Sequence, residues 1–179
     1  GQQTAATGFP THTGPLFLPY ATCCATGTRR YVYEKVGNPD DTMGPPWDTD
    51  YSWRVQLAGY QLTLVENAVV HYRLRHGARA RFLQAYNWGD KQLNLQLRYG
   101  MTPWPRYLAY CLYGLAQRGA NLVFGTLSGK RPFSFWVWHW GFARGQLNAL
   151  PRLFMAQMRG QGAMRGGAWE EQRGETDQS

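Results

Sequence analysis

Acidic residues, cysteines and long apolar runs are all scarce in this 179-residue chain. Its three cysteines (Cys23, Cys24 and Cys111) form no CxxC pair and no Cys/His spacing typical of zinc, which predicts a reduced, cytoplasmic chain. No apolar run approaches the ~18–20 residues of a membrane span. The chain opens without a signal peptide and without an initiator Met, so we expect a fragment of a longer protein.

Positive charge and aromatic residues are abundant instead. The chain has 19 basic residues against 11 acidic ones and a net charge of +8. Such a surface suits a nucleic acid, an anionic membrane or a phosphorylated substrate, and charge alone does not choose among them. Aromatic residues make up 15%, including eight tryptophans, which suit a core, a sugar face or a membrane interface. The remaining composition indicates one globular domain.

Hydrophobic periodicity and turn residues predict strands and helices up to about residue 72, and helices alone beyond it. This order indicates an α/β piece followed by a helical extension, with too few strands for a complete α/β domain. The predicted elements are an extended segment over 16–26, a helix over 27–37 capped by Thr28, a helix from Asp48 to Gly59, one or two strands over 60–73, and helices over 78–99, 103–119 and 131–150.

Two aspartates, Asp48 and Asp50, stand where a loop meets a helix. A metal-binding Asp-x-Asp normally follows a buried strand, but here Gly44-Pro45-Pro46-Trp47 leads in. The local pattern alone therefore favours a helix start, with Asp48 as N-cap and Asp50 stabilised by the helix dipole.

A longer pattern surrounds this pair. The segments "RRYVYEKVGNPDD" and "WDTDYSWRVQLAGYQLTLVENAVVHYRLR" resemble the C-terminal half of family-2 glycosyltransferases of the GT-A fold. In that family an Arg-Arg helix precedes an acidic motif, usually Glu-Asp, which opens a helix continuing Trp-Arg-x-x-x-Ala-Gly-Tyr. A strand ending in His follows. The similarity covers roughly Leu16 to Gly100, and several motifs in order make it more specific than any one of them.

The resemblance implies an α/β fold, the C-terminal half of a GT-A-like (Rossmann-type) nucleotide-sugar transferase domain. It assigns residues 1–100 to the acceptor-side half of the catalytic domain. Helical periodicity then predicts a helical, aromatic-rich extension (101–159), and the Gly-rich, polar end predicts a disordered tail (160–179). The nucleotide-binding half has no counterpart here, so we expect the fragment to be inactive alone.

The resemblance also implies an inverting sugar transfer from a nucleotide-diphosphate sugar to a hydroxyl acceptor, with Asp48 as general base. Trp47 stands where the family has Glu, and it is assigned with Cys23 and Cys24 to the acceptor side. General-base assistance of this kind contributes about 10²–10⁴ in rate. Asp50 is expected to support the helix start and Arg54 to pair with a nearby acid.

His71 ends the expected strand. The general expectation for a lone histidine is a hydrogen-bonded, inert side chain, whereas the resemblance implies a ligand of Mn²⁺ or Mg²⁺. Most ligands of that metal would come from the missing N-terminal half. Four arginines follow. They form a solvated basic face, or one or two of them contact the diphosphate or an anionic lipid carrier: Arg73, Arg75, Arg79 and Arg81.

The stretch from Phe133 to Trp140 is aromatic on nearly every side, which fits either a buried helix or an interfacial helix with Arg131, Arg144 and Arg152 on anionic lipid. The expected partners are a nucleotide-sugar donor and a sugar or lipid-linked acceptor, with peripheral contact at the inner face of the membrane left open. Nucleic acid is not an expected partner. The rival hypotheses are a non-enzymatic basic module that binds membrane or nucleic acid, and a pseudoenzyme.

Overall fold

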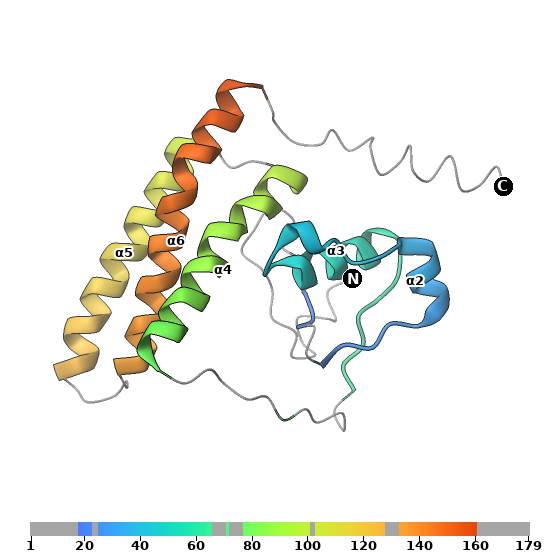
Figure 1. Ribbon diagram of the computed structural model, residues 1–179, viewed down its shortest axis with the longest axis horizontal. Helices are drawn as coiled ribbons and strands as arrows, with labels where there is room; N and C mark the ends of the chain where they lie inside the picture. Colours follow the sequence, from blue (N-terminus) through green and yellow to red (C-terminus); the bar gives the residue numbers. More distant parts are fainter. Residues whose placement is uncertain are drawn as a thin grey trace.

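The computed structural model describes residues 18–22, 25–65, 71, 77–100, 103–127 and 133–160, and this part of the chain is helical. In Figure 1, α6 lies between α5 and α4, while α2 and α3 lie on the other side of α4. The elements are α2 (Arg30–Val36), the 3₁₀ helix η2 (Asp41–Met43), α3 (Trp47–Leu57), α4 (Ala78–Tyr99), α5 (Trp104–Leu127) and α6 (Phe133–Met158).

The predicted α/β fold, as the C-terminal half of a GT-A-like Rossmann-type domain, is wrong for the described residues, which contain five α-helices and no strand. The alternating pattern from Tyr60 onward predicted a strand, but residues 61–65 have no regular structure. Tyr60 and Leu62 pack instead against the side chains of α2 and α3. A strand needs a hydrogen-bonded neighbour, and the apolar pattern is equally served by this packing. The rest of the expected strand lies largely outside the described residues.

The helix predictions from local signals agree better with the structure. The helix predicted over 78–99 is α4, and it ends before Gly100, whose φ is +129°. The short helix before Gly37 is α2, although its N-cap position is Arg29 and not Thr28. In the described part of the chain, no helix has the length and apolar character needed to cross a membrane.

Helices α4 and α6 approach each other very closely. A Cβ placed on Gly89 of α4 would lie 2.1 Å from the carbonyl oxygen of Phe142, and one on Gly145 of α6 would lie 2.1 Å from that of Tyr86. Ala85, fully buried, continues the same contact. Backbone therefore packs against backbone, and only small residues permit this distance.

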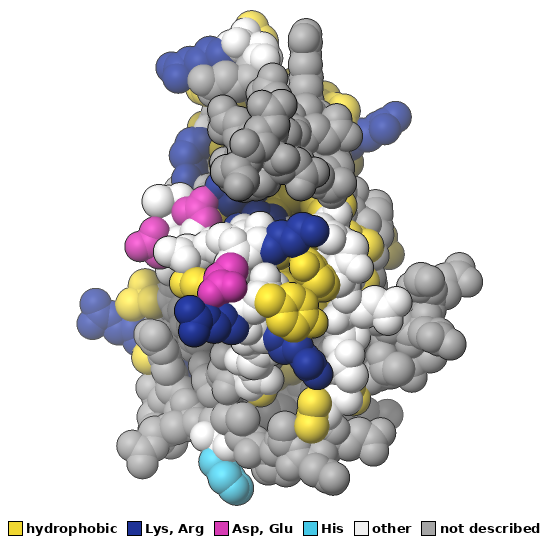
Figure 2. Space-filling view, turned by 90° about the vertical axis from the view of Figure 1, so that its right-hand side faces the viewer, with side chains coloured by type: hydrophobic (Ala, Val, Ile, Leu, Met, Phe, Trp, Pro, Cys, Tyr) yellow, Lys and Arg dark blue, Asp and Glu magenta, His cyan; other side chains and the backbone are white. Residues whose placement is uncertain are grey.

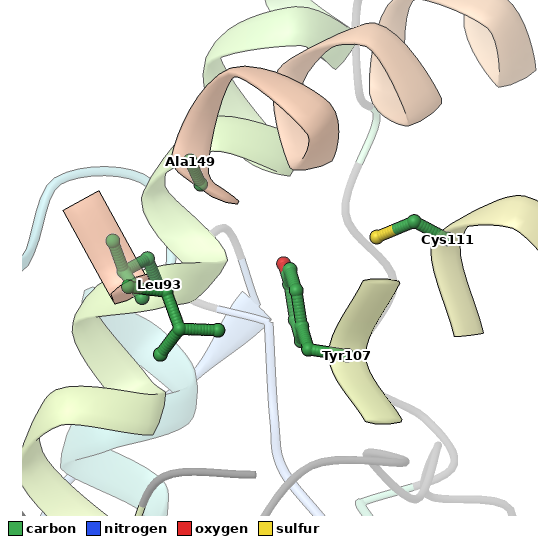
Figure 3. Packing of buried hydrophobic residues seen from close by; sticks show 5 residues of the cluster. Leu93, Tyr107, Cys111 and Ala149 are labelled. Carbon is green, nitrogen blue, oxygen red and sulfur yellow. The ribbon is translucent and has the colours of Figure 1, made fainter. Parts of the chain in front are cut away.

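The third helix of the bundle, α5, attaches to this pair through a small apolar cluster. Figure 3 shows Tyr107 and Cys111 of α5 converging on Leu93 of α4 and Ala149 of α6. Burial raises the pKa of the Cys111 thiol to about 11, with the nearby Arg118 acting in the opposite direction. Cys111 is therefore an inert packing residue and not a reactive thiol.

The aromatic segment from 133 to 140 begins α6 and is partly turned into the bundle. Trp136 is buried, and Trp138 lies against Trp88 of α4 with ring centroids 6.4 Å apart. Trp140 is more exposed. Much of the aromatic surface that made this segment a candidate for lipid contact is thus used in packing between helices.

Candidate functional site

Both aspartates of the Asp-x-Asp pair lie in the first turn of α3 and are buried, Asp48 at 6% exposure and Asp50 at 0%. The helix begins at Trp47, and Pro46 occupies the N-cap position without a side-chain cap. The prediction of Asp48 as N-cap is therefore wrong, because the helix starts earlier than the acidic pattern indicated. Acidic side chains in a first turn remain favoured by the helix dipole.

Asp50 is held by three side chains. Its Oδ2 accepts from Arg54 Nε at 3.1 Å, and its Oδ1 accepts from Arg98 Nη1 at 2.9 Å and from the Tyr99 hydroxyl at 2.7 Å. Burial raises the pKa of Tyr99, and the negative charge of Asp50 raises it further. A buried carboxylate with this many donors is a structural anchor, since it joins α3 to the end of α4.

The two arginines extend this anchor to the loop after α2. Arg54 donates from Nη1 to the carbonyl oxygen of Val36 at 3.0 Å and from Nη2 to that of Asn38 at 2.8 Å. Arg98 also pairs with Asp40. The chain from the end of α2 to η2 is thereby fixed against the start of α3. We call these side chains the Asp50 network: Asp40, Asp50, Arg54, Arg98 and Tyr99.

The segment 18–22 lies along α3 and is held there by hydrogen bonds between side chains of α3 and the backbone of the segment. These contacts align a short piece of chain with α3. They are Ala21 N to Ser52 Oγ at 3.1 Å, Trp53 Nε1 to the Leu18 carbonyl at 3.2 Å, and Gln56 Nε2 to the Pro19 carbonyl at 2.8 Å.

The charge of Asp48 acts on a residue of the segment 18–22. Burial raises the pKa of the Tyr20 phenol, and the negative charge of Asp48 raises it further. The Asp48 Oδ1 accepts from the backbone N–H of Thr49 at 2.7 Å and from its hydroxyl at 3.3 Å. A carboxylate at a helix start, close to a phenol, is able to accept a proton from a hydroxyl group.

Of the three residues assigned to the acceptor side, the structure describes Trp47. Trp47 packs with Met43, Trp53 and Leu95 and so belongs to a hydrophobic cluster. Cys23 and Cys24 lie outside the described residues.

His71 is exposed, and the described residues contain no group of three His, Cys, Asp or Glu side chains able to hold a metal. The described residues do not by themselves form a metal site.

No family model matches this chain, and neither does any curated protein or solved structure. The assignment of the site therefore depends on its residues and their geometry.

Arg98 and Tyr99 are the two site residues that the sequence did not single out. An Arg in the last turn of a helix is ordinarily explained by the helix dipole, and both residues are almost 50 positions from Asp50. The sequence offered one indirect indication of these partners. An aspartate buried at position 50 needs more than one cationic partner to be stable.

Proposed function

We propose that the residues around the start of α3 form the acceptor side of an inverting sugar transferase, with Asp48 as general base. The single observation that most supports this proposal is that the two aspartates of one helical turn have different surroundings. Asp50 accepts hydrogen bonds from Arg54, Arg98 and Tyr99, whereas the negative charge of Asp48 adds to burial in raising the pKa of Tyr20, in the segment that runs along α3.

The proposed reaction uses Asp48 to take the proton of an acceptor hydroxyl. As the proton leaves, the acceptor oxygen forms a bond to the anomeric carbon of the donor sugar, and the bond from that carbon to the diphosphate oxygen breaks with its electron pair. The products are the glycosylated acceptor with inverted configuration and a nucleoside diphosphate. The substrate classes are a nucleotide-diphosphate sugar and a sugar or lipid-linked hydroxyl.

The rigidity of the surroundings supports this role. A general base must be held within hydrogen-bond reach of the proton that it abstracts. The Asp50 network fixes the turn that carries Asp48, and the hydrogen bonds from Ser52 and Gln56 fix the segment next to it. Trp47, which stands where the resembling family has Glu, supplies packing and no second carboxylate.

The test is Asp48→Asn in the protein encoded by the intact open reading frame that contains these residues. Release of nucleoside diphosphate is measured over a panel of nucleotide sugars and lipid or oligosaccharide acceptors. We expect kcat to fall by about 10²–10⁴ because the base is lost while its shape is kept. Asp41→Asn is the matched control, since Asp41 is an exposed acid of η2.

Two further measurements separate the proposal from its rivals. Asp48→Glu keeps the carboxylate and is expected to retain part of the activity, whereas a purely structural role predicts similar losses for Asn and Glu. The thermal midpoint of Asp48→Asn tells whether the loss comes from unfolding. A wild-type protein that turns over no donor, or an Asp48→Asn variant as active as wild type, would point to a pseudoenzyme or a binding module.

A further inference from the structure

A long segment in the C-terminal half of this chain is free of acidic residues. Between Asp90 and Glu170 there are 79 residues (91–169) and not one Asp or Glu. Figure 2 shows the α2 side of the molecule for contrast, where acidic and basic side chains lie close together. The same 79 residues carry ten cations: Lys91, Arg98, Arg106, Arg118, Lys130, Arg131, Arg144, Arg152, Arg159 and Arg165.

Helix α5 is the outermost element of this region. It packs on α6 through Tyr107 and Cys111, and it lies at the edge of the molecule on the side away from α3 (Figure 1). Residues of α5 away from this buried stripe are exposed. We call six of them the α5 outer face, which has three large apolar side chains, one arginine and no acid: Arg106, Ala109, Tyr110, Leu112, Tyr113 and Ala116.

The large apolar side chains on the α5 outer face are at least half exposed to solvent. Tyr110 is 50% exposed, Leu112 53% and Tyr113 67%. At the start of α5, Trp104 meets Phe154 of α6 edge to face, with centroids 5.6 Å apart, and both rings remain partly exposed. Tyrosine and tryptophan of this kind are suited to a boundary that is apolar on one side and wet on the other.

The charge of the α5 outer face indicates which kind of partner it binds. A second copy of the chain would bring an equally acid-free, cationic surface against it, and like charges oppose that contact. A nucleic acid would bind Arg106 through its phosphates but offers little apolar surface to Leu112. An anionic lipid surface offers both, because its phosphate headgroups bind arginine while its acyl chains accommodate apolar side chains.

We propose that the α5 outer face binds an anionic membrane surface, with α5 lying in the plane of the headgroups. Arg106 contacts a lipid phosphate, and Tyr110, Leu112 and Tyr113 enter the interface. This proposal stands independently of the role of Asp48. It also moves the lipid contact from the aromatic segment 133–140, where Trp136 is buried and Trp138 packs on Trp88, to the neighbouring helix.

Sedimentation of the purified protein with vesicles tests the proposal. We expect binding to mixed phosphatidylcholine–phosphatidylglycerol vesicles, weakened by salt, and little binding to phosphatidylcholine alone. The double variant Tyr110→Gln/Tyr113→Gln should lower the partition coefficient by about tenfold or more, since it removes apolar area at the interface. Arg106→Gln should lower it by about fivefold, the effect of one cation at such a surface.

Matched controls come from the opposite end of the molecule. Tyr31→Gln/Tyr33→Gln removes two tyrosines of α2 with comparable exposure, 54% and 42%, and Arg29→Gln removes an exposed arginine. Neither control should change vesicle binding by more than about twofold. Circular dichroism of all variants verifies that the helices persist.

Three results would overturn the proposal. The first is equal binding to the two kinds of vesicle or unchanged binding by Tyr110→Gln/Tyr113→Gln. The second is a dimer detected by light scattering that this variant dissociates, in protein that ignores vesicles, which would assign the face to a second copy. The third is salt-sensitive binding to a single-stranded oligonucleotide, lost in the same variant, without vesicle binding.

Discussion

The contact of α3 with α4 is polar and buried, whereas the contact of α4 with α6 is made by glycine and alanine against backbone. The first depends on Asp50, Arg54 and Arg98, three ionised groups from two helices. The second depends on the absence of side chains at Gly89 and Gly145. One helix, α4, takes part in both.

The two contacts respond to different perturbations. Burying ionised groups costs desolvation free energy, which is offset only when every partner is present. The Asp50 network is therefore sensitive to pH and to single substitutions. Close packing of backbones depends on shape and not on charge, so the α4–α6 contact should ignore pH and salt. The polar contact also carries the proposed catalytic turn, where geometric precision matters more than stability does.

The largest expected effect comes from filling the α4–α6 contact. In Gly145→Ala the new Cβ would meet the Tyr86 carbonyl oxygen at 2.1 Å and the Asp90 nitrogen at 2.7 Å, both of them backbone atoms. The helices must separate, and we expect the free energy of unfolding to fall by about 3 kcal/mol or more. Urea unfolding followed by circular dichroism measures this loss.

A second glycine provides the matched control. Gly119 lies within α5, and a Cβ there meets nothing within 4 Å. Gly119→Ala should therefore raise the free energy of unfolding by about 0.5–1 kcal/mol, the ordinary helix preference for alanine. Opposite signs for the two alanines would support the close contact. A Gly145→Ala protein as stable as wild type would mean that α4 and α6 do not pack in this way.

The next effect concerns the polar contact. Asp50→Asn keeps the volume of the side chain but leaves Arg54 and Arg98 without their shared carboxylate. Loss of one partner of a buried ion pair costs about 3–5 kcal/mol, and the arginines are 25% exposed, so we expect about 2–4 kcal/mol here. Chemical unfolding of Asp50→Asn beside the exposed control Asp41→Asn measures it.

The same pair of variants connects stability with function. If the Asp50 network positions the turn that carries Asp48, Asp50→Asn should also lower kcat at temperatures where the variant is still folded. A variant that loses stability but keeps full kcat would restrict the network to a structural role and separate it from the proposed base.

The sequence predicted those features that depend on neighbouring residues. The end of α4 at Gly100 and the existence of helices after the Asp pair and beyond residue 103 follow from periodicity and helix-ending glycines. The predicted ends at 119 and 150 were wrong, because α5 continues to Leu127 and α6 to Met158. The strand from Tyr60 was wrong because alternating apolar residues also suit a segment packed on helices, and single-chain periodicity does not distinguish the two.

Contacts between distant residues were not predictable in the same way. Arg98 and Asp50 meet only because α4 turns back onto α3, and nothing within either helix specifies that crossing. The close contact of α4 with α6 did leave a trace in the sequence, since Gly141 and Gly145 are four residues apart on one helix face. That spacing is typical of close helix packing, and its significance appears only once the partner helix is known.

The smallest expected effect is a pH dependence from Asp40. A hydrogen bond from the Thr42 hydroxyl, aided by Arg98, lowers the pKa of Asp40 to about 2, below the ~3.9 of an unfolded Asp. A depressed folded-state pKa gives stability that is fully present above about pH 4 and is lost as the pH falls toward 2. The pair is partly solvated, so its contribution should stay under about 1 kcal/mol. Urea unfolding of wild type and Asp40→Asn should therefore differ at pH 5 and converge near pH 2. A difference that persists unchanged at pH 2 would show that Asp40 acts through its shape and not through its charge.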